Sequence, residues 1–578
     1  MKFRSSSIAI FSLILPNILL AKYCVNIPPF LSRLRDGVDI TKLDLLPLDW
    51  GTDDGFKNPV IDFTCNGGQM RNINNKQYDI PDQVWSIIDI PNGLLSSKTE
   101  IQKTSHGVKQ SMGIKVDVGY GEGIFSSSGS YKTIQNYITN SSRFIEDVTS
   151  YTSGYKIILK PYWALEFGQI AQMYIDKRLP KIFNDSTSLQ YMEFIKSFGT
   201  HIFNHGKFGG LLRLVLATDE SYYLDKTDSQ VEAQAKATFF NTIKLGGGGS
   251  SGTQRVDEAF TRATRKDVRY YGGTTNLIDT KGITAWQPTV ERNPWLFGGS
   301  LTEISGMIAD ISKQQSMKRA VQVYMDKAYL KELLRIVARY YTSREWDQHR
   351  HVLMNYNKQV NSMLQHNLPD HNAIVTLAKT IENATVIPGW FRSSRICYNW
   401  YADGDNGQCS EYGEQTGLLC ANVNQWTGYY RDDTDRGNGG CLMRWGIMSS
   451  GYDDWFKNVS ICYKWGSESD GGQCGSGTSG VTCANVNSYT DYYKDDTDRR
   501  AGGCYMQWML SVPTSSPLWI QNAEICYKWD SDGDREQCGR GVSKILCAKA
   551  NTYTEAYRDD SDRRTGGCSM SWRIKVIS

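Results

Sequence analysis

The sequence carries little net charge for its length and few of the residues that build metal or catalytic sites. Its 578 residues sum to a formal charge of +3 and include 7 histidines. A charge this small argues against nucleic acid and against a strongly anionic partner. Close CxxC pairs, which structural zinc sites use, do not occur. We therefore expect no bound nucleic acid, no metal and no cofactor.

Long hydrophobic runs are missing beyond the N-terminus. A membrane-spanning helix needs about 20 consecutive apolar residues. The apolar run from Ile8 to Leu20 follows Lys2 and Arg4, is interrupted by Pro16 and is closed by Ala21. This order is typical of an export signal, which we place at residues 1–21. The mature protein is therefore expected to be secreted.

Cysteine is scarce in the first two thirds of the chain. Of the fourteen cysteines, Cys24 and Cys65 lie near the N-terminus and the other twelve lie from Cys397 onward. An even number of cysteines behind an export signal predicts disulfides formed in an oxidising compartment. Four glycosylation sequons fit the same route. They begin at Asn140, Asn184, Asn383 and Asn458.

The last third contains three copies of one unit, which we place at residues 389–450, 451–515 and 516–578. Each copy opens on a Trp and carries four cysteines. Two bridges within each copy are expected, and three pairings are possible. The cysteines are, copy by copy, Cys397, Cys409, Cys420 and Cys441; Cys462, Cys474, Cys483 and Cys504; and Cys526, Cys538, Cys547 and Cys568.

Short aromatic runs alternate with Gly- and Asp-rich turns in each copy, which predicts strands. Units this small bury little apolar surface, so disulfides compensate. We expect an all-β, pseudo-threefold accessory domain over residues 389–578. Each copy also contains a DDTDR-like run, such as Asp495 to Arg499. Its carboxylates could bind calcium and its arginines could meet anionic headgroups, but a turn in which the two pair is the favoured interpretation.

The strongest motif lies in the middle of the chain. Tyr191 is followed, after six residues, by Phe198, Gly199, Thr200 and His201, and then by the pair Gly209 and Gly210. This pattern resembles the signature of the membrane-attack-complex/perforin (MACPF) superfamily, with Ile202 where the family usually has an aromatic residue. The flanking segments resemble the family as well; they are Leu165 to Pro180, Tyr270 to Thr275 and Arg292 to Trp295.

The resemblance implies a fold of the α+β class. A bent, antiparallel four-stranded sheet is flanked by two clusters of short helices, and Gly272 and Gly273 belong to its core and hinge. We place this domain at residues 22–345 and a helical connector at 346–388. The signature is structural in the family, so His201 is not expected to be catalytic. On membranes, subunits of the family form a ring, and each cluster unfurls into a β-hairpin that lines a pore.

One segment has the alternation that a membrane-lining strand requires. The apolar residues are Val231, Ala233, Ala235, Ala237 and Phe239, with polar residues between them. The same stretch is rich in Ala, Gln and Lys, so it can also rest as a helix. Gly246 to Gly249 would form a flexible tip and Val256 to Val268 a return arm. The first cluster is placed loosely at residues 119–154.

The resemblance favours a secreted pore-forming toxin or immune effector, and no enzyme. Such a protein binds membrane lipid or a surface receptor and forms a homo-oligomeric ring. Within the family, the C-terminal triple repeat resembles that of defensive snail egg proteins, which implies a possible disulfide-linked lectin chain. The alternative is a non-lytic adhesion, developmental or egg storage protein. A secreted hydrolase is a weaker third reading, because no catalytic partner is specified near His201.

Overall fold

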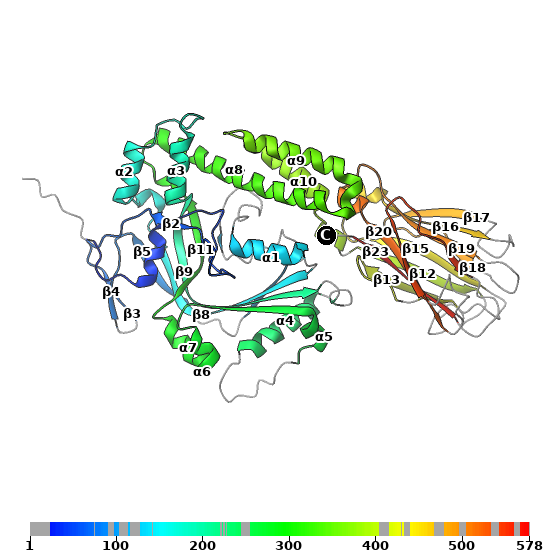
Figure 1. Ribbon diagram of the computed structural model, residues 1–578. Helices are drawn as coiled ribbons and strands as arrows, with labels where there is room; N and C mark the ends of the chain where they lie inside the picture. The colour runs from blue at the N-terminus through cyan, green and yellow to red at the C-terminus, as the bar shows by residue number, and fades with distance from the viewer. Residues whose placement is uncertain are drawn as a thin grey trace, which may run out of the picture.

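The structure is a computed structural model. It describes residues 23–73, 76–90, 97–102, 114–115, 128–140, 143–219, 222, 226, 228–243, 255–392, 394–403, 416–428, 430–432, 440–467, 479–495, 504–532, 543–559 and 567–576. The predicted export signal lies outside these residues. A sheet with its helices forms one end of the molecule, long helices form the middle, and a β-rich unit forms the other end (Figure 1).

Two long antiparallel strands form the centre of the main sheet. β8 (Arg143–Leu159) and β9 (His201–Asp219) pair from Arg143↔Asp219 to Ile158↔His205. β5 (Val84–Ile90) and β6 (Lys98–Gln102) follow one another along the outer edge of β8. β10 (Thr264–Tyr271) and β11 (Trp295–Glu303) do the same along β9. The sheet is therefore four strand positions wide through most of its length.

Smaller strands complete the sheet at its edges. β1 (Asp36–Val38) joins β9 and also β2 (Phe56–Pro59), and β7 (Ile114–Lys115) pairs in parallel with β11. β3 (Met70–Ile73) and β4 (Lys76–Asp79) form a separate two-stranded sheet. With β1, β2 and β7 included, the main sheet has nine strands. The chain thus has mixed helix and sheet content, as predicted.

Helices cover both faces of the β8–β9 pair (Figure 1). α1 (Gly129–Asn140) packs on one face, where Tyr131 and Ile134 share a core with Leu211 and Val215. The other face is covered by α4 (Asp228–Ile243), α5 (Glu258–Ala263), α6 (Asn276–Lys281) and α7 (Ile283–Val290). Because both faces are buried, the second half of β9 is apolar from Leu211 to Ala217 except at Arg213, rather than alternating.

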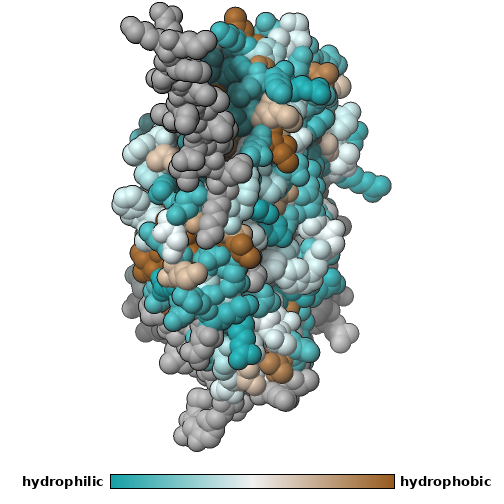
Figure 2. Space-filling model, turned by 90° about the vertical axis from the view of Figure 1, so that its left-hand side faces the viewer, coloured by the Kyte–Doolittle hydropathy of each residue, from teal (hydrophilic) through white to brown (hydrophobic). Residues whose placement is uncertain are grey.

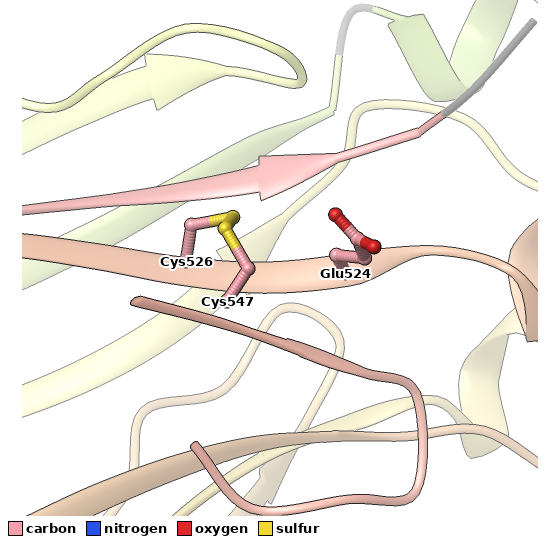
Figure 3. A group of neighbouring side chains, drawn as sticks. All are labelled: Glu524, Cys526 and Cys547. Atoms are coloured by element: carbon pink, nitrogen blue, oxygen red, sulfur yellow. A yellow bond between two sulfur atoms is a disulfide. The ribbon is translucent and has the colours of Figure 1, made fainter. Parts of the chain in front are cut away.

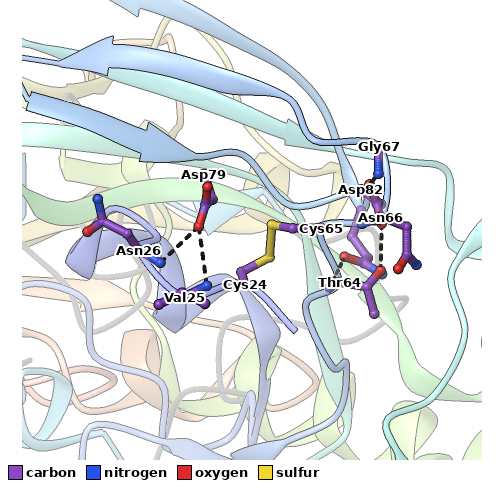
Figure 4. The surroundings of a disulfide bond; sticks show 10 residues. Cys24, Val25, Asn26, Thr64, Cys65, Asn66, Gly67, Asp79 and Asp82 are labelled. Carbon is purple, nitrogen blue, oxygen red and sulfur yellow. Dashed lines mark hydrogen bonds between the residues drawn. A yellow bond between two sulfur atoms is a disulfide. The ribbon is translucent and has the colours of Figure 1, made fainter. Parts of the chain in front are cut away.

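The N-terminal segment is attached to the sheet region by a disulfide and by carboxylates. Cys24 and Cys65 form the disulfide, next to the short helix η1 (Pro29–Arg35). On one side of the disulfide, Asp79 accepts hydrogen bonds from the amides of residues 25 and 26 (Figure 4). On the other side, Asp82 accepts from the amides of residues 66 and 67. Both ends of this bridge are therefore fixed.

Helices join the sheet to the C-terminal unit. α2 (Gln169–Lys177) and α3 (Ser188–Phe198) lie at the end of the sheet, preceded by η4 (Tyr162–Ala164). The long α8 (Ile311–Thr342) then runs toward the repeats, beside α9 (Arg350–Gln365) and α10 (His371–Thr385) (Figure 1). No helix among the described residues is long and apolar enough to cross a membrane. Short helices complete the set: η6 (Ile304–Met307), η7 (Arg344–His349), η8 (Asp454–Asn458), α11 (Gly389–Arg392) and α12 (Leu518–Gln521).

Each repeat contributes three strands to its own sheet and one short strand to another copy's sheet. β18 of the second copy pairs with β15 of the first, β22 of the third with β19 of the second, and β14 of the first with β23 of the third. This exchange is cyclic, so the three copies close on one another. The strands are, copy by copy, β12 (Arg395–Asp403), β13 (Thr416–Asn422), β14 (Tyr430–Asp432) and β15 (Gly440–Met448); β16 (Ser460–Ser467), β17 (Ser479–Asn485), β18 (Tyr493–Asp495) and β19 (Cys504–Ser511); and β20 (Glu524–Asp532), β21 (Ser543–Lys549), β22 (Tyr557–Asp559) and β23 (Gly567–Lys575).

The three copies share one aromatic core. Trp445, Trp508 and Trp572 occupy corresponding positions, are fully buried, and have ring centroids 5.6 Å apart in every pair. In each copy the first cysteine pairs with the third; the bridges are Cys397–Cys420, Cys462–Cys483 and Cys526–Cys547. Of the remaining cysteines, Cys409, Cys474 and Cys538 lie outside the described residues, as do the acidic-basic runs after the short strands.

Candidate functional site

The signature residues form the corner at which α3 meets the start of β9. Tyr191 and Phe198 are buried in the main core, and the Tyr191 hydroxyl donates a hydrogen bond to the carbonyl oxygen of Pro180 at 2.5 Å. Gly199 ends the helix with a φ of +81°, and a Cβ atom there would lie 2.5 Å from the backbone of Val38. Only glycine fits both the conformation and the space.

Thr200 joins this corner to the N-terminal segment. Its hydroxyl donates to the carbonyl oxygen of Val38 at 3.0 Å and accepts from the amide of Ile40 at 3.2 Å. The side chain thus mimics a strand partner for β1. These contacts are between residues far apart in sequence, and they give the signature a structural task.

His201 has no arrangement suited to proton transfer with a substrate. Its side chain is fully buried, and burial lowers its pKa to about 3, so the imidazole stays neutral. Its Nδ1 lies 2.9 Å from the hydroxyl of Thr200. His205 is four positions further along the same strand, and its Nδ1 lies 2.8 Å from the hydroxyl of Ser300 instead. The two imidazoles therefore have different hydrogen-bond partners. Two histidines four residues apart can bind one metal ion when they lie on a helix, but these two lie on a strand.

One group of potential metal ligands occurs among the described residues, and its chemistry excludes metal binding. Glu524, Cys526 and Cys547 lie close together, but the two sulfur atoms form a disulfide (Figure 3). Metal ions bind thiolates, which these sulfurs cannot supply. Glu524 accepts a hydrogen bond from Lys575 at 2.9 Å. The site is thus an ion pair beside a structural bridge.

Glycines at the middle of the sheet leave room for a tryptophan side chain. A Cβ on Gly210 would lie 2.5 Å from the ring of Trp286 in α7. Gly272 and Gly273 follow β10 with φ of +79° and +64°, and the indole N–H of Trp286 donates to the carbonyl oxygen of Gly272 at 2.8 Å. Gly209 is opposite Trp295 in the ladder with β11. These glycines mark the point where β10 gives way to β11.

The alternating segment from Val231 to Phe239 rests in the structure as part of helix α4. Val231, Ala235 and Phe239 are spaced by four residues and share a buried core with Leu212, Leu214 and Leu216 of β9 and with Phe144 and Val148 of β8. The helix itself contacts β6 and β8. Ala237 is also buried, whereas Ala233 is exposed. The helix therefore buries four of the five predicted membrane-contacting residues and leaves the fifth in solvent.

The return arm predicted at residues 256–268 is part helix and part strand. Asp257 begins α5 by accepting from the amide of Ala259, and its own amide donates to Gln234 of α4 at 2.8 Å. From Thr264 onward the chain is already in β10. The predicted glycine tip at residues 246–249 lies outside the described residues. Residues 143–154 of the loosely placed first cluster belong to β8, a core strand, so that cluster is shorter than predicted.

Sequence reasoning missed a buried ion pair beside this region. Arg213 of β9 and Asp147 of β8 are both almost fully buried, with a closest N–O distance of 2.6 Å. Arg213 also donates to the carbonyl oxygen of Leu46 at 2.6 Å. The only signal in the sequence is a single Arg inside an apolar run. Removing one partner of such a pair leaves a buried charge unpaired.

The sequons differ in how the structure places them. Asn184, Asn383 and Asn458 are exposed, and Asn140 ends α1.

Apolar side chains are exposed on η4, α2 and α3, among them Trp163, Ile170 and Leu189. On the face seen in Figure 2, such residues form small separate groups within a largely polar surface. This face does not single out a docking site.

The comparisons with known proteins agree on one family. Residues 27–334 match the family model of the MAC/Perforin domain. The chain is 34% identical over 558 residues to the perivitellin-2 67 kDa subunit of Pomacea maculata, covering 96% of this chain and 95% of that protein. The same subunit of Pomacea canaliculata is 34% identical over 559 residues, with equal coverage. The structure of GNIP1Aa from Chromobacterium piscinae aligns with a TM-score of 0.41 at 13% identity, over 85% of this chain and 77% of that one.

Proposed function

Because the chain belongs to the MAC/Perforin family, we propose that it is a secreted pore-forming protein. It binds lipid or a receptor on target membranes, assembles into a homo-oligomeric ring and inserts two β-hairpins per subunit. In this proposal residues 22–345 form the pore-forming domain, 346–388 the connector and 389–578 the accessory domain. The bent four-stranded sheet of the family corresponds to the positions of β5/β6, β8, β9 and β10/β11.

The observation that carries the proposal is where the β9–β10 ladder stops. Its last pair is Thr218↔Thr264, and the segment between these two residues contains α4 and α5. Straightening the two helices would lengthen a hairpin that already exists. No strand of the sheet has to be broken for this change.

Helix α4 is held to the sheet by few large side chains. Val231 and Phe239 supply most of its buried apolar surface, and Ala235 and Ala237 add little. Burial of a Val or Phe side chain contributes about 1.5–3 kcal/mol each. Release of α4 also uncovers the apolar side chains of β8 and β9 beneath it, so new ladder hydrogen bonds and lipid contacts have to offset the loss on both surfaces. The residue types of α4 suit either state.

The strand edges support assembly into a ring. Among the described residues, β5 and β6 pair only with β8, and β10 pairs only with β9. The outer edges of these strands can therefore pair with another subunit, because an unpaired strand edge is a template for pairing. A closed ring satisfies both edges of every subunit. Insertion and assembly then support each other, because unpaired edges are costly within lipid.

A second chain is a further part of the proposal. The relatives carry the word subunit in their names, which is consistent with a partner such as a lectin. The described bridges join cysteines of this chain to each other, and no free cysteine occurs among the described residues. A partner chain would therefore be held by contacts other than these cysteines.

A disulfide that locks α4 to α5 tests the hairpin. The side chain of Gln234 accepts a hydrogen bond from the backbone amide of Asp257 at 2.8 Å, so the two positions are neighbours in the resting state and are chosen for a cysteine pair. In an extended hairpin that continues the β9–β10 register, the same positions would be roughly 30 Å apart, given a rise of about 3.3 Å per residue. The oxidised double variant should bind cells and liposomes without releasing dye, and a reductant should restore release.

The two single-cysteine variants are the matched controls and should release dye with or without reductant. Release by the oxidised double variant would contradict hairpin insertion by this segment. Binding without release by the wild-type protein on every membrane tested would instead favour a non-lytic adhesion or storage role.

A further inference from the structure

A cavity lies where the helical connector meets the repeats. It has a volume of about 550 Å³ and is lined by α9, by the end of α10 and by the segments that open the second and third copies. We infer that this cavity is a carbohydrate site, and that its occupant is the first sugar of a glycan attached to Asn383. The inference does not depend on pore formation, because every residue that carries it lies outside the sheet and its helices.

Asn383 gives the cavity an occupant from the chain itself. It lines the cavity, is exposed and begins the sequon Asn383 to Thr385 near the end of α10. The exposed sequon residues Asn184 and Asn458 do not belong to the lining. An N-linked glycan is attached through the side-chain nitrogen of asparagine. The first sugar on Asn383 would therefore lie directly beside the cavity.

The charge of the lining disfavours an anionic ligand. Glu382 and Asp453 line the cavity, and no Lys or Arg of the described residues does. One carboxylate oxygen of Glu382 accepts a hydrogen bond from the hydroxyl of Tyr329 at 3.0 Å. Ionised carboxylates only accept hydrogen bonds. The lining thus suits a neutral ligand with several donors, such as the hydroxyl groups and the acetamido N–H of an N-acetylated sugar.

The cavity also has an aromatic wall. Trp455 lines it and is partly buried, and its ring centroid lies 6.0 Å from that of Trp390 and 5.7 Å from that of Trp519. One face of a pyranose ring consists of C–H groups, which pack on the apolar face of an indole. Small-ligand sites combine such an apolar surface with a few polar groups. Trp455 and the two carboxylates provide this combination.

One buried hydroxyl at the cavity has no partner within the protein. Ser516 lines the cavity and is 4% exposed, and its hydroxyl oxygen has no hydrogen-bond partner among the described residues. A buried polar group without a partner costs free energy. A sugar has hydroxyl groups that both donate and accept, so it can supply this partner. A cationic ligand would suit the carboxylates but could not accept a hydrogen bond from this serine.

The burial of Thr385 sets the order of events. This threonine completes the sequon, but it is 2% exposed and its hydroxyl donates to the carbonyl oxygen of Ile381 at 2.7 Å. The enzyme that attaches the glycan recognises the threonine as well as the asparagine, so attachment has to precede the packing of α10. The glycan is then present when the connector docks on the repeats. Its first sugar would tie α10 to the second and third copies.

Glycan cleavage on the full-length protein tests this inference. The chain is secreted from mammalian cells that make only high-mannose glycans, and peptide mass spectrometry determines whether Asn383 is occupied. An endoglycosidase that cuts between the first two sugars then acts on the native and on the denatured protein. We expect Asn383 to be occupied and to be cleaved about tenfold more slowly in the native protein, the ratio that about 1.4 kcal/mol of contact free energy produces.

Two tryptophan substitutions distinguish a sugar in the cavity from a sugar in solvent. Ser515 is exposed and lines the cavity, so Ser515→Trp should displace the sugar and bring native cleavage close to the denatured rate. Thr514→Trp is the matched control, because Thr514 is exposed as well but does not line the cavity. It should leave native cleavage slow. Thermal unfolding checks that both variants fold.

Several results would overturn the inference. These are an unoccupied Asn383, equal cleavage rates for native and denatured wild-type protein, and equal native rates for the two tryptophan variants. Binding of free N-acetylglucosamine or of choline to a chain with an unoccupied Asn383 would also overturn it, since the cavity would then serve an external ligand. Dye release is not measured in this experiment, so its outcome and the outcome for the proposed function are independent.

Discussion

Gly199 and Gly282 have the same backbone conformation but different surroundings. Both have a φ of +81°, with ψ of −172° and 175°. A Cβ on Gly199 would lie 2.5 Å from the backbone of Val38, whereas a Cβ on Gly282 would have no atom within 4 Å. The pair therefore separates the cost of the conformation from the cost of the contact.

Alanine at each of these glycines should destabilise the protein to different extents. Gly282→Ala should lower the free energy of unfolding by about 1–3 kcal/mol, the cost of an extended, positive-φ conformation that is almost exclusive to glycine. Gly199→Ala should cost clearly more, because β1 and α3 must also move apart. Thermal unfolding followed by circular dichroism measures both. Equal shifts would mean that the signature corner is not tightly packed.

Some site residues can be predicted from the sequence and others cannot. Gly199 and Thr200 belong to a local motif, so their neighbourhood is readable from the chain. Arg213 and Asp147 form their buried pair from residues 66 positions apart. The sequence around either residue gives no indication that the other is its partner. Pairing of this kind depends on the register of β8 against β9, which a single sequence does not specify.

Helix α4 shows why one sequence pattern can support two structures. Val231, Ala235 and Phe239 have helical spacing, and Val231 to Phe239 also alternates at the strand period. The sequence predicts both possibilities, but the helix forms here because this face of β6, β8 and β9 offers it an apolar surface. Tertiary contacts thus decide between two patterns that are both present.

The turn between the second and third strands of each repeat is bonded to the neighbouring copy. Asn424, Asn487 and Asn551 all have φ between 63° and 69°, and each donates its backbone amide to a strand of the neighbouring copy. The side chain of Asn487 also exchanges two hydrogen bonds with the backbone of Ser449, at 2.8 and 3.0 Å. Asparagine is one of the few residues that tolerates this conformation.

Two substitutions at Asn487 separate the hydrogen bonds from the conformation. Asn487→Gly keeps the favourable φ but loses the two side-chain bonds, and should cost roughly 1–2 kcal/mol. Asn487→Ala loses the bonds and adds strain, so it should cost about 1 kcal/mol more. The thermal transition of the repeats reports both values. A glycine variant as stable as wild type would show that the side-chain bonds are not needed.

At the scale of the whole molecule, the cyclic strand exchange makes the repeats interdependent. Removing the third copy takes β22 away from the second copy and leaves β14 of the first copy without a partner. It also removes Trp572 from the shared core. The sequence predicted a pseudo-threefold domain of three similar units, but it contained no sign of which strand each unit lends to another. That exchange depends on how the copies are arranged in space.

A chain ending at residue 515 should therefore fail to form stable repeats, although two complete copies remain. We expect rapid cleavage within residues 389–515 under limited proteolysis, while the region before residue 345 stays protected. The full-length chain is the control and should resist cleavage throughout. Protease-resistant repeats in the truncated protein would show that the copies fold one by one.

The pairing of β14 with β23 also has a consequence for biosynthesis. Tyr430 is paired with Met570, close to the last residue of the chain. The first repeat therefore leaves the ribosome long before its partner strand has been translated. At about 5–20 residues per second, the wait is on the order of 10 s. During that time β14 has no partner strand and the aromatic core lacks Trp572, so the repeats can complete their fold only after β23 has been translated.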